Sequence, residues 1–399
     1  MCHEPLSVVQ LNVFPFQVQR APEGWGVYLH IPFCARKCPY CDFNTYAGLE
    51  RLYEVYVRAL VTELTRIAET LERPVVRTIF LGGGTPTVLP AEALTRILRT
   101  VYDVFRVLPD AEITCEANPG TADRERFRVL RELGVNRLSL GAQSFDTAEL
   151  RFLGRIHEAD DISRAVDAAR AAGLVNINLD LMYGLPGQEA NTWMHSLRQA
   201  VVLEPTHISC YALTVEEHTP LARWVASGRV PPPDEDVQAE LYELAQEFLS
   251  AAGYVHYEIS NWARPGWMCA HNLIYWRNEP FLGIGAGAHA CDLRHRWWIE
   301  RSPQAYVQRV HSGRTTVVGW ETLSPETAMA ETMILGLRLL VEGVNRKRFY
   351  KRFGVDPLTR YSKQVWRLQS WGLIEVLADR IRLTPRAYPI ANRVFMEFL

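Results

Sequence analysis

The segment VYLHIPFCARKCPYCDFNTY, residues 27–46, decides the fold. It opens with an apolar, β-branched run typical of a buried strand and continues directly into Cys34, Cys38 and Cys41. Three thiolates with C-x3-C-x2-C spacing on one tight loop can hold three irons of a [4Fe–4S] cluster. No fourth cysteine stands nearby, since Phe43 follows two positions after the third, so one iron would keep an open position for a ligand. A structural zinc site or a coincidental spacing is the alternative.

Strands and helices alternate outward from this loop. The apolar pattern predicts strands at 27–33, 78–82, 112–117, 137–142, 175–182 and 206–213, with helices at 50–71, 91–106, 121–133, 159–172 and 190–203. Gly134 and Gly173 fall where helices should end before the next strand. This α/β alternation predicts a parallel sheet with right-handed crossovers, either curled into an open barrel or laid out as a doubly wound sheet.

The sequence pattern changes after the sixth predicted strand. A proline-rich break at 230–236 precedes a helix predicted at 234–251, and the stretch 254–320 is rich in Trp, Tyr, Gly and Pro without long periodic runs. From Ser324 the pattern predicts a helix, a second helix, a hairpin and a last helix over 385–399, in the order of a small winged-helix-like α+β domain. The expected divisions are an N-terminal extension (1–23), a barrel (24–232), a barrel-associated region (233–320) and a C-terminal domain (321–399).

Composition excludes several classes of function. The 399 residues carry a net charge of -2, so no whole-chain basic field attracts nucleic acid. The C-terminal domain has no strong basic recognition stripe, so we expect no nucleic-acid partner. No apolar stretch is long enough to predict a transmembrane helix, and the first residues do not form a signal peptide. We therefore expect a soluble cytoplasmic protein, in which the five scattered cysteines are small apolar side chains.

Polar residues and glycines cluster where the predicted strands end. The second strand runs into Gly82, Gly83, Gly84 and Thr85, which allow close backbone approach and expose N–H and C=O groups to a ligand. Later strands end at or near Glu116, Gln143, Arg155 and Asp180. Because buried parallel strands are normally apolar, four successive polar strand ends indicate a shared pocket at the carboxyl edge of the sheet.

With these motifs in place, the sequence resembles the radical SAM superfamily, and within it the group of the anaerobic coproporphyrinogen III oxidases. The resemblance implies a partial (β/α)6 barrel with a [4Fe–4S] cluster and S-adenosylmethionine (SAM) at its mouth. Matched motif by motif, it places these residues at or near SAM: Tyr28, Tyr40, Gly83, Gly84, Thr85, Glu116, Gln143, Arg155, Asp180 and Ala212. It assigns the cluster to Cys34, Cys38 and Cys41, and no residue is assigned as catalytic.

Two subgroups share these motifs. The oxidases, HemN, carry another cysteine two positions after the third, where this chain has Phe43. The motifs CPYCDF (38–43) and HNLIYW (271–276) are instead similar to the HemW family of heme chaperones. That resemblance implies heme as a ligand and a heme-acceptor protein, for example a respiratory heme enzyme, as the partner. His271 is the first choice of heme ligand, with Cys269 and His289 as alternatives and a hydrogen-bonded structural histidine as the competing interpretation.

Two enzymatic hypotheses remain open beside the chaperone. One is the oxygen-independent oxidative decarboxylation of coproporphyrinogen III, motivated by the complete set of SAM residues. The other is a radical SAM reaction on a different substrate. Since an acidic substrate calls for basic groups, Arg36 and Lys37 in the cluster loop are the candidates.

Overall fold

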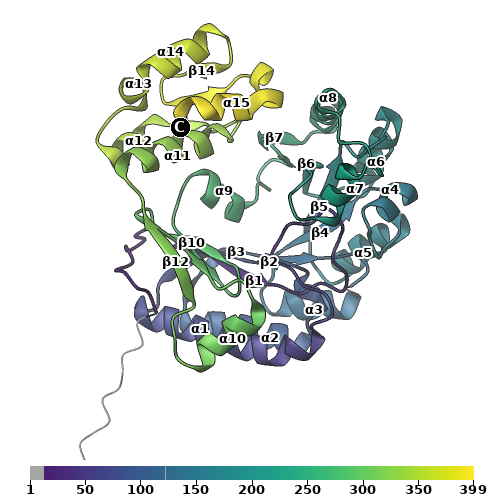
Figure 1. Cartoon of the computed structure of the whole chain (residues 1–399), viewed down its shortest axis with the longest axis vertical. Coiled ribbons are helices and arrows are strands. Elements are labelled where there is room, and N and C mark those ends of the chain that lie inside the picture. The colour runs from purple at the N-terminus through teal and green to yellow at the C-terminus, as the bar shows by residue number, and fades with distance from the viewer. Residues whose placement is uncertain (1–12, 122) are drawn as a thin grey trace, which may run out of the picture.

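A computed structural model describes residues 13–121 and 123–399. A single sheet of twelve strands curls around the middle of the molecule, with helices on its outer side (Figure 1). The α/β class, the partial barrel and the small C-terminal α+β domain are thereby confirmed. The first twelve residues of the predicted N-terminal extension lie outside the described residues, and the four domain boundaries stay a prediction.

The barrel is built from six consecutive parallel strands, which lie side by side in chain order. The strands are β1 (Trp25–Ile31), β2 (Val75–Gly83), β3 (Arg106–Ala117), β4 (Arg137–Gln143), β5 (Asn176–Tyr183) and β6 (His207–Ala212). The helices between and after them are α1 (Tyr53–Thr70), α2 (Ala91–Val104), α3 (Arg124–Glu132), α4 (Thr147–Phe152), α5 (Ala159–Ala171), α6 (Ala190–Val202), α7 (Pro220–Ala226) and α8 (Glu235–Ala251). Short 3₁₀ turns cover Glu50–Leu52 and Pro86–Val88.

The stretch 254–320 extends the sheet at both edges, which the sequence pattern did not predict. On one edge lie β8 (Asn261–Ala263) and β7 (Val255–Glu258), and on the other β9 (Phe281–Ile284), β10 (His289–Cys291), β11 (His295–Ile299) and β12 (Val317–Thr322). Helix α10 (Pro303–His311) connects β11 to β12. Strands of three to six residues are too short for their alternation to be distinguished from loop sequence.

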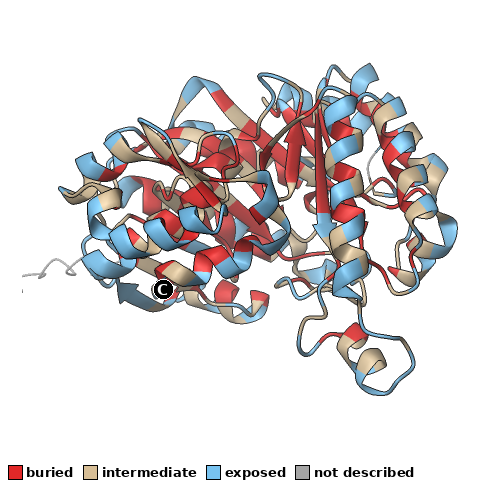
Figure 2. Cartoon of the chain, turned by 90° about the horizontal axis from the view of Figure 1, so that it is seen from above, coloured by how far each residue is buried: buried red, intermediate tan, exposed pale blue. Residues whose placement is uncertain are grey.

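The sheet is buried, and the exposed residues lie mainly on the elements around it. The strands form the buried interior, whereas the outer faces of the surrounding helices are exposed (Figure 2). Trp193, Trp262 and Trp297 are among the largest side chains that are completely buried. The short helix α9 (Ala270–Trp276) lies inside the curl of the sheet and carries the HNLIYW motif (Figure 1).

The C-terminal domain has its own apolar core, formed by residues between Met329 and Phe398. Its helices are α11 (Pro325–Leu337), α12 (Arg346–Phe353), α13 (Pro357–Arg360) and α14 (Ser362–Ser370), and its sheet is β13 (Val344–Asn345), β15 (Arg380–Leu383) and β14 (Ile374–Val376). The single last helix predicted over 385–399 is wrong. Pro389 lacks an N–H and breaks the segment into a 3₁₀ turn (Pro385–Ile390), α15 (Ala391–Phe395) and a final 3₁₀ turn (Met396–Phe398).

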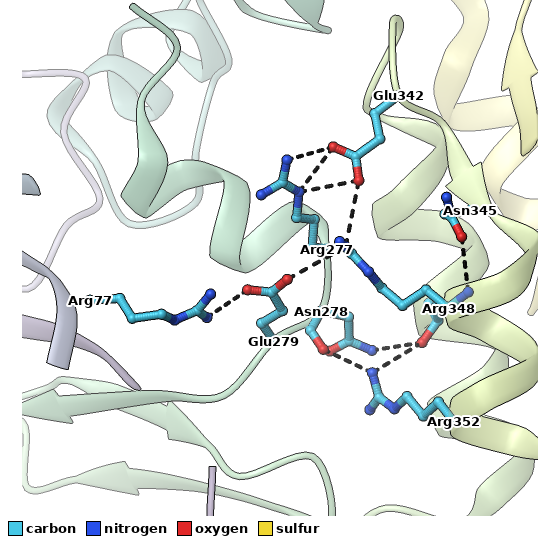
Figure 3. Close-up of polar contacts among 9 residues, drawn as sticks. Arg77, Arg277, Asn278, Glu279, Glu342, Asn345, Arg348 and Arg352 are labelled. Atoms are coloured by element: carbon cyan, nitrogen blue, oxygen red, sulfur yellow. Dashed lines mark hydrogen bonds and ion pairs between the residues drawn. The ribbon is translucent and has the colours of Figure 1, made fainter. Parts of the chain in front are cut away.

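A polar network fastens α9 between the barrel and the C-terminal domain (Figure 3). Directly after α9, Glu279 accepts from Arg77 of β2 at 2.7 Å and pairs with Arg348 of α12 at 3.4 Å. Arg277 forms a two-pronged ion pair with Glu342, with its nearest N–O distance at 2.7 Å. Since these groups are mostly half-buried and shared among several partners, they hold the position of α9 more firmly than isolated surface pairs would.

Within the described residues, no helix combines the length and the apolar character needed to cross a membrane.

Candidate functional site

The cysteine loop follows β1 and is closed by its own backbone. The Cys34 N–H donates to the Tyr46 carbonyl at 2.9 Å, and the Lys37 ammonium donates to the carbonyls of Phe43 and Thr45 at 3.1 Å each. All three thiols, Cys34, Cys38 and Cys41, line one cavity of about 500 Å³ at the carboxyl ends of the strands. The donor set fits a cluster held on one side, because three sulfur atoms from one loop face a cavity large enough for a further ligand.

Each thiol has a polar neighbour from a different element. The Thr85 hydroxyl donates to Cys34 Sγ at 3.8 Å, and Arg155 Nη1 donates to Cys38 Sγ at 3.5 Å. Thr45 Oγ1 lies 4.0 Å from Cys41 Sγ. Burial raises the pKa of the Cys34 and Cys41 thiols, so these side chains keep their protons until iron binding displaces them. In the described part of the chain, no group of three His, Cys, Asp or Glu side chains is arranged to hold a single metal ion.

Most of the predicted SAM residues line the same cavity. The set comprises Tyr40, Gly83, Gly84, Thr85, Glu116, Gln143, Arg155, Asp180 and Ala212. Tyr40 belongs to the cysteine loop, and the others come from β2 to β6 and the segments that follow them, so the curl of the sheet brings together residues that are far apart in sequence. Tyr28 and His271 are not among the lining residues.

The glycine segment works differently from our prediction. The N–H groups expected to be free for a ligand are used internally: Gly83 donates to Glu116 Oε2 at 3.0 Å, and Gly84 donates to the Ile31 carbonyl at 2.9 Å. Gly83 has a φ of 105°, and a Cβ there would overlap the His30 ring. A Cβ on Gly84 would overlap the Phe33 carbonyl. The glycines therefore let β2 pack against the end of β1.

Two half-buried carboxyl groups, those of Glu116 and Asp180, line the cavity, and Asp180 lies close enough to affect the ionisation of Glu116. Burial, followed by the neighbouring Asp180, raises the pKa of Glu116 to about 8. Burial also raises the pKa of Asp180, whose oxygens accept from Ser139 at 3.1 Å and from Asn178 at 2.8 Å. Sequence reasoning missed Ser139 and Asn178, although both are polar residues inside predicted strands and that signal could have found them.

The raised pKa of Glu116 predicts a pH-dependent effect of Glu116→Gln on stability. In the unfolded chain this carboxyl ionises near pH 4.5, whereas in the folded chain it keeps its proton up to about pH 8. The folded wild type therefore loses stability as pH rises through that window, and the glutamine variant does not. Urea unfolding of the cofactor-free chains should favour the variant by about 2–4 kcal/mol more at pH 8 than at pH 5. A difference independent of pH would contradict the assigned protonation.

The backbone at the end of β4 is strained. Gln143 has a φ of 71°, a conformation that non-glycine residues rarely adopt. Arg155 reaches back to the same strand, since its Nη2 donates to the Gly141 carbonyl at 2.7 Å. Strain of this kind persists where the surroundings hold it in place, and here it directs a polar side chain into the cavity.

Tyr28 is half-buried and belongs to a chain of hydrogen bonds. Its hydroxyl is 3.0 Å from His30 Nδ1, and His30 Nε2 is 2.9 Å from the Asn44 carbonyl. Burial lowers the pKa of His30, so its ring is neutral and can donate from one nitrogen and accept at the other. Tyr28 is thereby linked to the end of the cysteine loop.

His271 occupies a closed environment inside the barrel. Its Nδ1 lies 2.7 Å from Thr78 Oγ1 and its Nε2 lies 2.8 Å from Tyr275 OH. The side chain is buried, and burial lowers its pKa to about 3. Glu112 of β3 accepts from the N–H groups of Ala270 and His271 and so caps the start of α9. Ligation of heme iron by His271 stays a prediction, and it requires one of the two ring contacts to break.

Further cavity residues escaped the sequence interpretation. They are Asp42, Thr45, Ala117, Asn118, Ser139, Gly141, Met182, Tyr211, Leu213, Thr214 and Glu216. Several follow a strand directly, so position after a parallel strand was an available signal. Of the two basic candidates, Lys37 already donates to two carbonyls of its own loop.

Comparison with known proteins agrees with this geometry. Residues 28–200 match the model of the radical SAM superfamily, and residues 323–390 match the HemN C-terminal domain. The fold is similar to that of coproporphyrinogen III oxidase (HemN) from Escherichia coli, with a TM-score of 0.82 at 22% identity, covering 98% of this chain and 92% of that one.

The sequence identity to a second group of relatives is higher than the identity to HemN. The heme chaperone HemW of Mycobacterium tuberculosis (strain H37Rv) is 38% identical over 94% of this chain and 95% of its own length. Heme chaperone HemW of Bacillus subtilis is 36% identical over 94% of this chain and 99% of its own length. The chain therefore belongs to the HemW family within the radical SAM superfamily.

Proposed function

We propose that this protein is a heme chaperone, which binds heme and delivers it to an acceptor protein. It carries a [4Fe–4S] cluster with exchangeable SAM. The observation that carries the proposal is the cavity in which three cysteine thiols face the polar strand ends, with Phe43 at the position of the oxidases' additional cysteine. The names of the relatives at 36–38% identity favour the chaperone over an enzyme.

In this proposal, the residues of the site have separate roles. Cys34, Cys38 and Cys41 would hold the cluster, which offers SAM an iron with an open position and can supply electrons to it. Arg155 places positive charge beside the cluster sulfurs, and Glu116 with Asp180 offers hydrogen-bonding groups to the ribose side of SAM. The remaining residues proposed to surround SAM are Tyr28, Tyr40, Gly83, Gly84, Thr85, Gln143 and Ala212.

The partner is a heme-acceptor protein, for example a respiratory heme enzyme, and the protein acts in the cytoplasm. The family resemblance favours His271 as the heme ligand, although both nitrogens of its ring already have hydrogen-bond partners. Nucleic acid is not a partner in this proposal.

Anaerobic reconstitution followed by heme titration tests the proposal. We expect the full chain to retain heme through gel filtration and to show a shifted Soret band, because a protein ligand replaces water on the iron. In a parallel assay with coproporphyrinogen III, SAM and a reductant, we expect no protoporphyrinogen. Absence of retained heme would contradict the proposal.

The second candidate is the oxygen-independent coproporphyrinogen III oxidase. The observation in its favour is that all the predicted SAM residues except Tyr28 meet the cluster loop in one cavity. A protein that only carries heme would not need this arrangement. Arg36 lines that cavity and could meet an acidic substrate. Turnover in the parallel assay would favour this candidate.

A further inference from the structure

The inner face of β10 and β11 presents an exposed histidine beside a tryptophan. His289 and Trp298 are opposite each other in the antiparallel pair, and their rings stack with centroids 6.3 Å apart at 30°. The alternate residues, including Ala290 and Trp297, point into the main core. Phe281, whose partner Cys291 shares the face of His289, contacts Tyr275 of α9 at 4.7 Å. This face therefore looks toward the inside of the curl.

Glycines on the neighbouring strands keep this face flat. Gly319 of β12 pairs with Trp298, and a Cβ there would overlap the indole ring. Gly283 of β9 lies beside β10, and a Cβ there would overlap the His289 carbonyl. The indole consequently lies over the strand with an uncovered part, since Trp298 is only half-buried. An exposed aromatic ring beside the histidine suits an apolar macrocycle, which an indole can contact edge to face.

Most other described histidines have their ring nitrogens engaged. Both nitrogens have hydrogen-bond partners in His30, His157, His207 and His271. His256 and His295 use at least one nitrogen in packed surroundings. The exposed ones are His195, His218, His289 and His311, and of these only His289 combines exposure with the inner face described above.

Cationic groups surround His289. Arg296 and Arg301 lie near its ring, and together with burial they lower its pKa. A neutral imidazole has the lone pair that iron needs. Arg296 is already paired with Glu321 and Glu331, whereas Arg301 is exposed and has no ion-pair partner among the described residues. Arg301 is thus available to a carboxylate.

This face adjoins the cluster loop. Asn44 donates to the carbonyls of Ala286 and Arg301 at 3.0 and 2.9 Å, and so ties the loop to both ends of the β10–β11 hairpin. Its neighbour Phe43 lines the cluster cavity and is 64% exposed. An apolar ligand on this face would therefore lie next to the residue that replaces the oxidases' cysteine.

We propose that the inner face of β10 and β11 binds the heme macrocycle, with His289 as a ligand of the iron, Trp298 in edge contact with the macrocycle and Arg301 paired with a propionate. The imidazole donates a lone pair to iron, and no bond to carbon forms or breaks. The inference rests on the proposed heme-carrier function and names its site.

The test titrates reconstituted full-length variants with heme and, separately, with iron-free protoporphyrin IX. We expect His289→Ala to weaken heme binding at least tenfold and to change the Soret band, with recovery of the band on adding imidazole. The same variant should bind iron-free protoporphyrin as the wild type does. Trp298→Leu should weaken both ligands. His311→Ala, an exposed histidine on α10, is the matched control and should change neither.

The outcomes separate the inference from the function on which it rests. A wild type that binds no heme overturns both. A wild type that binds heme while His289→Ala keeps the same affinity and spectrum overturns only the assignment to this face. Circular dichroism of each variant checks that the fold is retained, and Arg301→Ala, an exposed substitution, gives a second reading through weaker binding of both porphyrins.

Discussion

Replacing Cys38 with alanine is expected to abolish the iron–sulfur cluster and, with it, SAM binding. Two thiols cannot hold the cluster in the arrangement that leaves one iron open, and Arg155 loses the sulfur to which it donates at 3.5 Å. We expect iron content and the broad visible absorption to fall to background after anaerobic reconstitution. Equilibrium dialysis should show SAM affinity reduced by at least about 100-fold, which corresponds to about 2.7 kcal/mol.

The matched control is Cys210→Ala. Cys210 is buried in β6 and belongs to the apolar core, outside the residues that line the cavity. This variant should keep its iron and its SAM affinity, at a stability cost of about 1 kcal/mol. Equal iron loss in both variants would show that misfolding, rather than a missing ligand, explains the effect, and normal iron in Cys38→Ala would contradict the cluster assignment.

The second large effect is expected from His271→Ala. The substitution leaves the hydroxyls of Thr78 and Tyr275 without their buried partner and opens a cavity beside Phe80, whose ring centroid lies 5.1 Å from that of His271. Unpaired buried polar groups and a cavity together cost about 3 kcal/mol. Urea unfolding followed by tryptophan fluorescence should show this loss in the free energy of unfolding.

Heme binding distinguishes the two roles of His271. If the residue is structural, the variant that remains folded should bind heme with an unchanged Soret band. A variant with wild-type stability but no heme would instead identify His271 as the ligand. His311→Ala again provides the control, since it removes an exposed histidine from the end of α10.

The barrel was predictable because its signals are local and regular. Five of the six parallel strands lie within three residues of the predicted ranges, whereas β3 begins six residues earlier than predicted, and the cysteine loop follows β1 as expected. The polar strand ends meet in one cavity because parallel strands share a carboxyl edge. These features need only periodicity and topology.

The remaining features depend on tertiary contacts. Short strands such as β8 and β10 gain their conformation from pairing with neighbouring strands of the sheet, so their own sequence carries little signal. The position of α9 inside the curl depends on its cap by Glu112 and its contact with Thr78, which lie more than 150 residues away in sequence. The internal use of the Gly83 and Gly84 N–H groups likewise appears only when β1, β2 and β3 are assembled.

The most direct test of the account is heme transfer from the loaded chain to the apo form of a respiratory heme enzyme. If the chain is a heme chaperone, the donor's Soret band should decay as the acceptor's band grows. The rate should rise with acceptor concentration, because the two proteins meet during transfer. A rate independent of the acceptor, equal to passive heme release, would contradict the chaperone role.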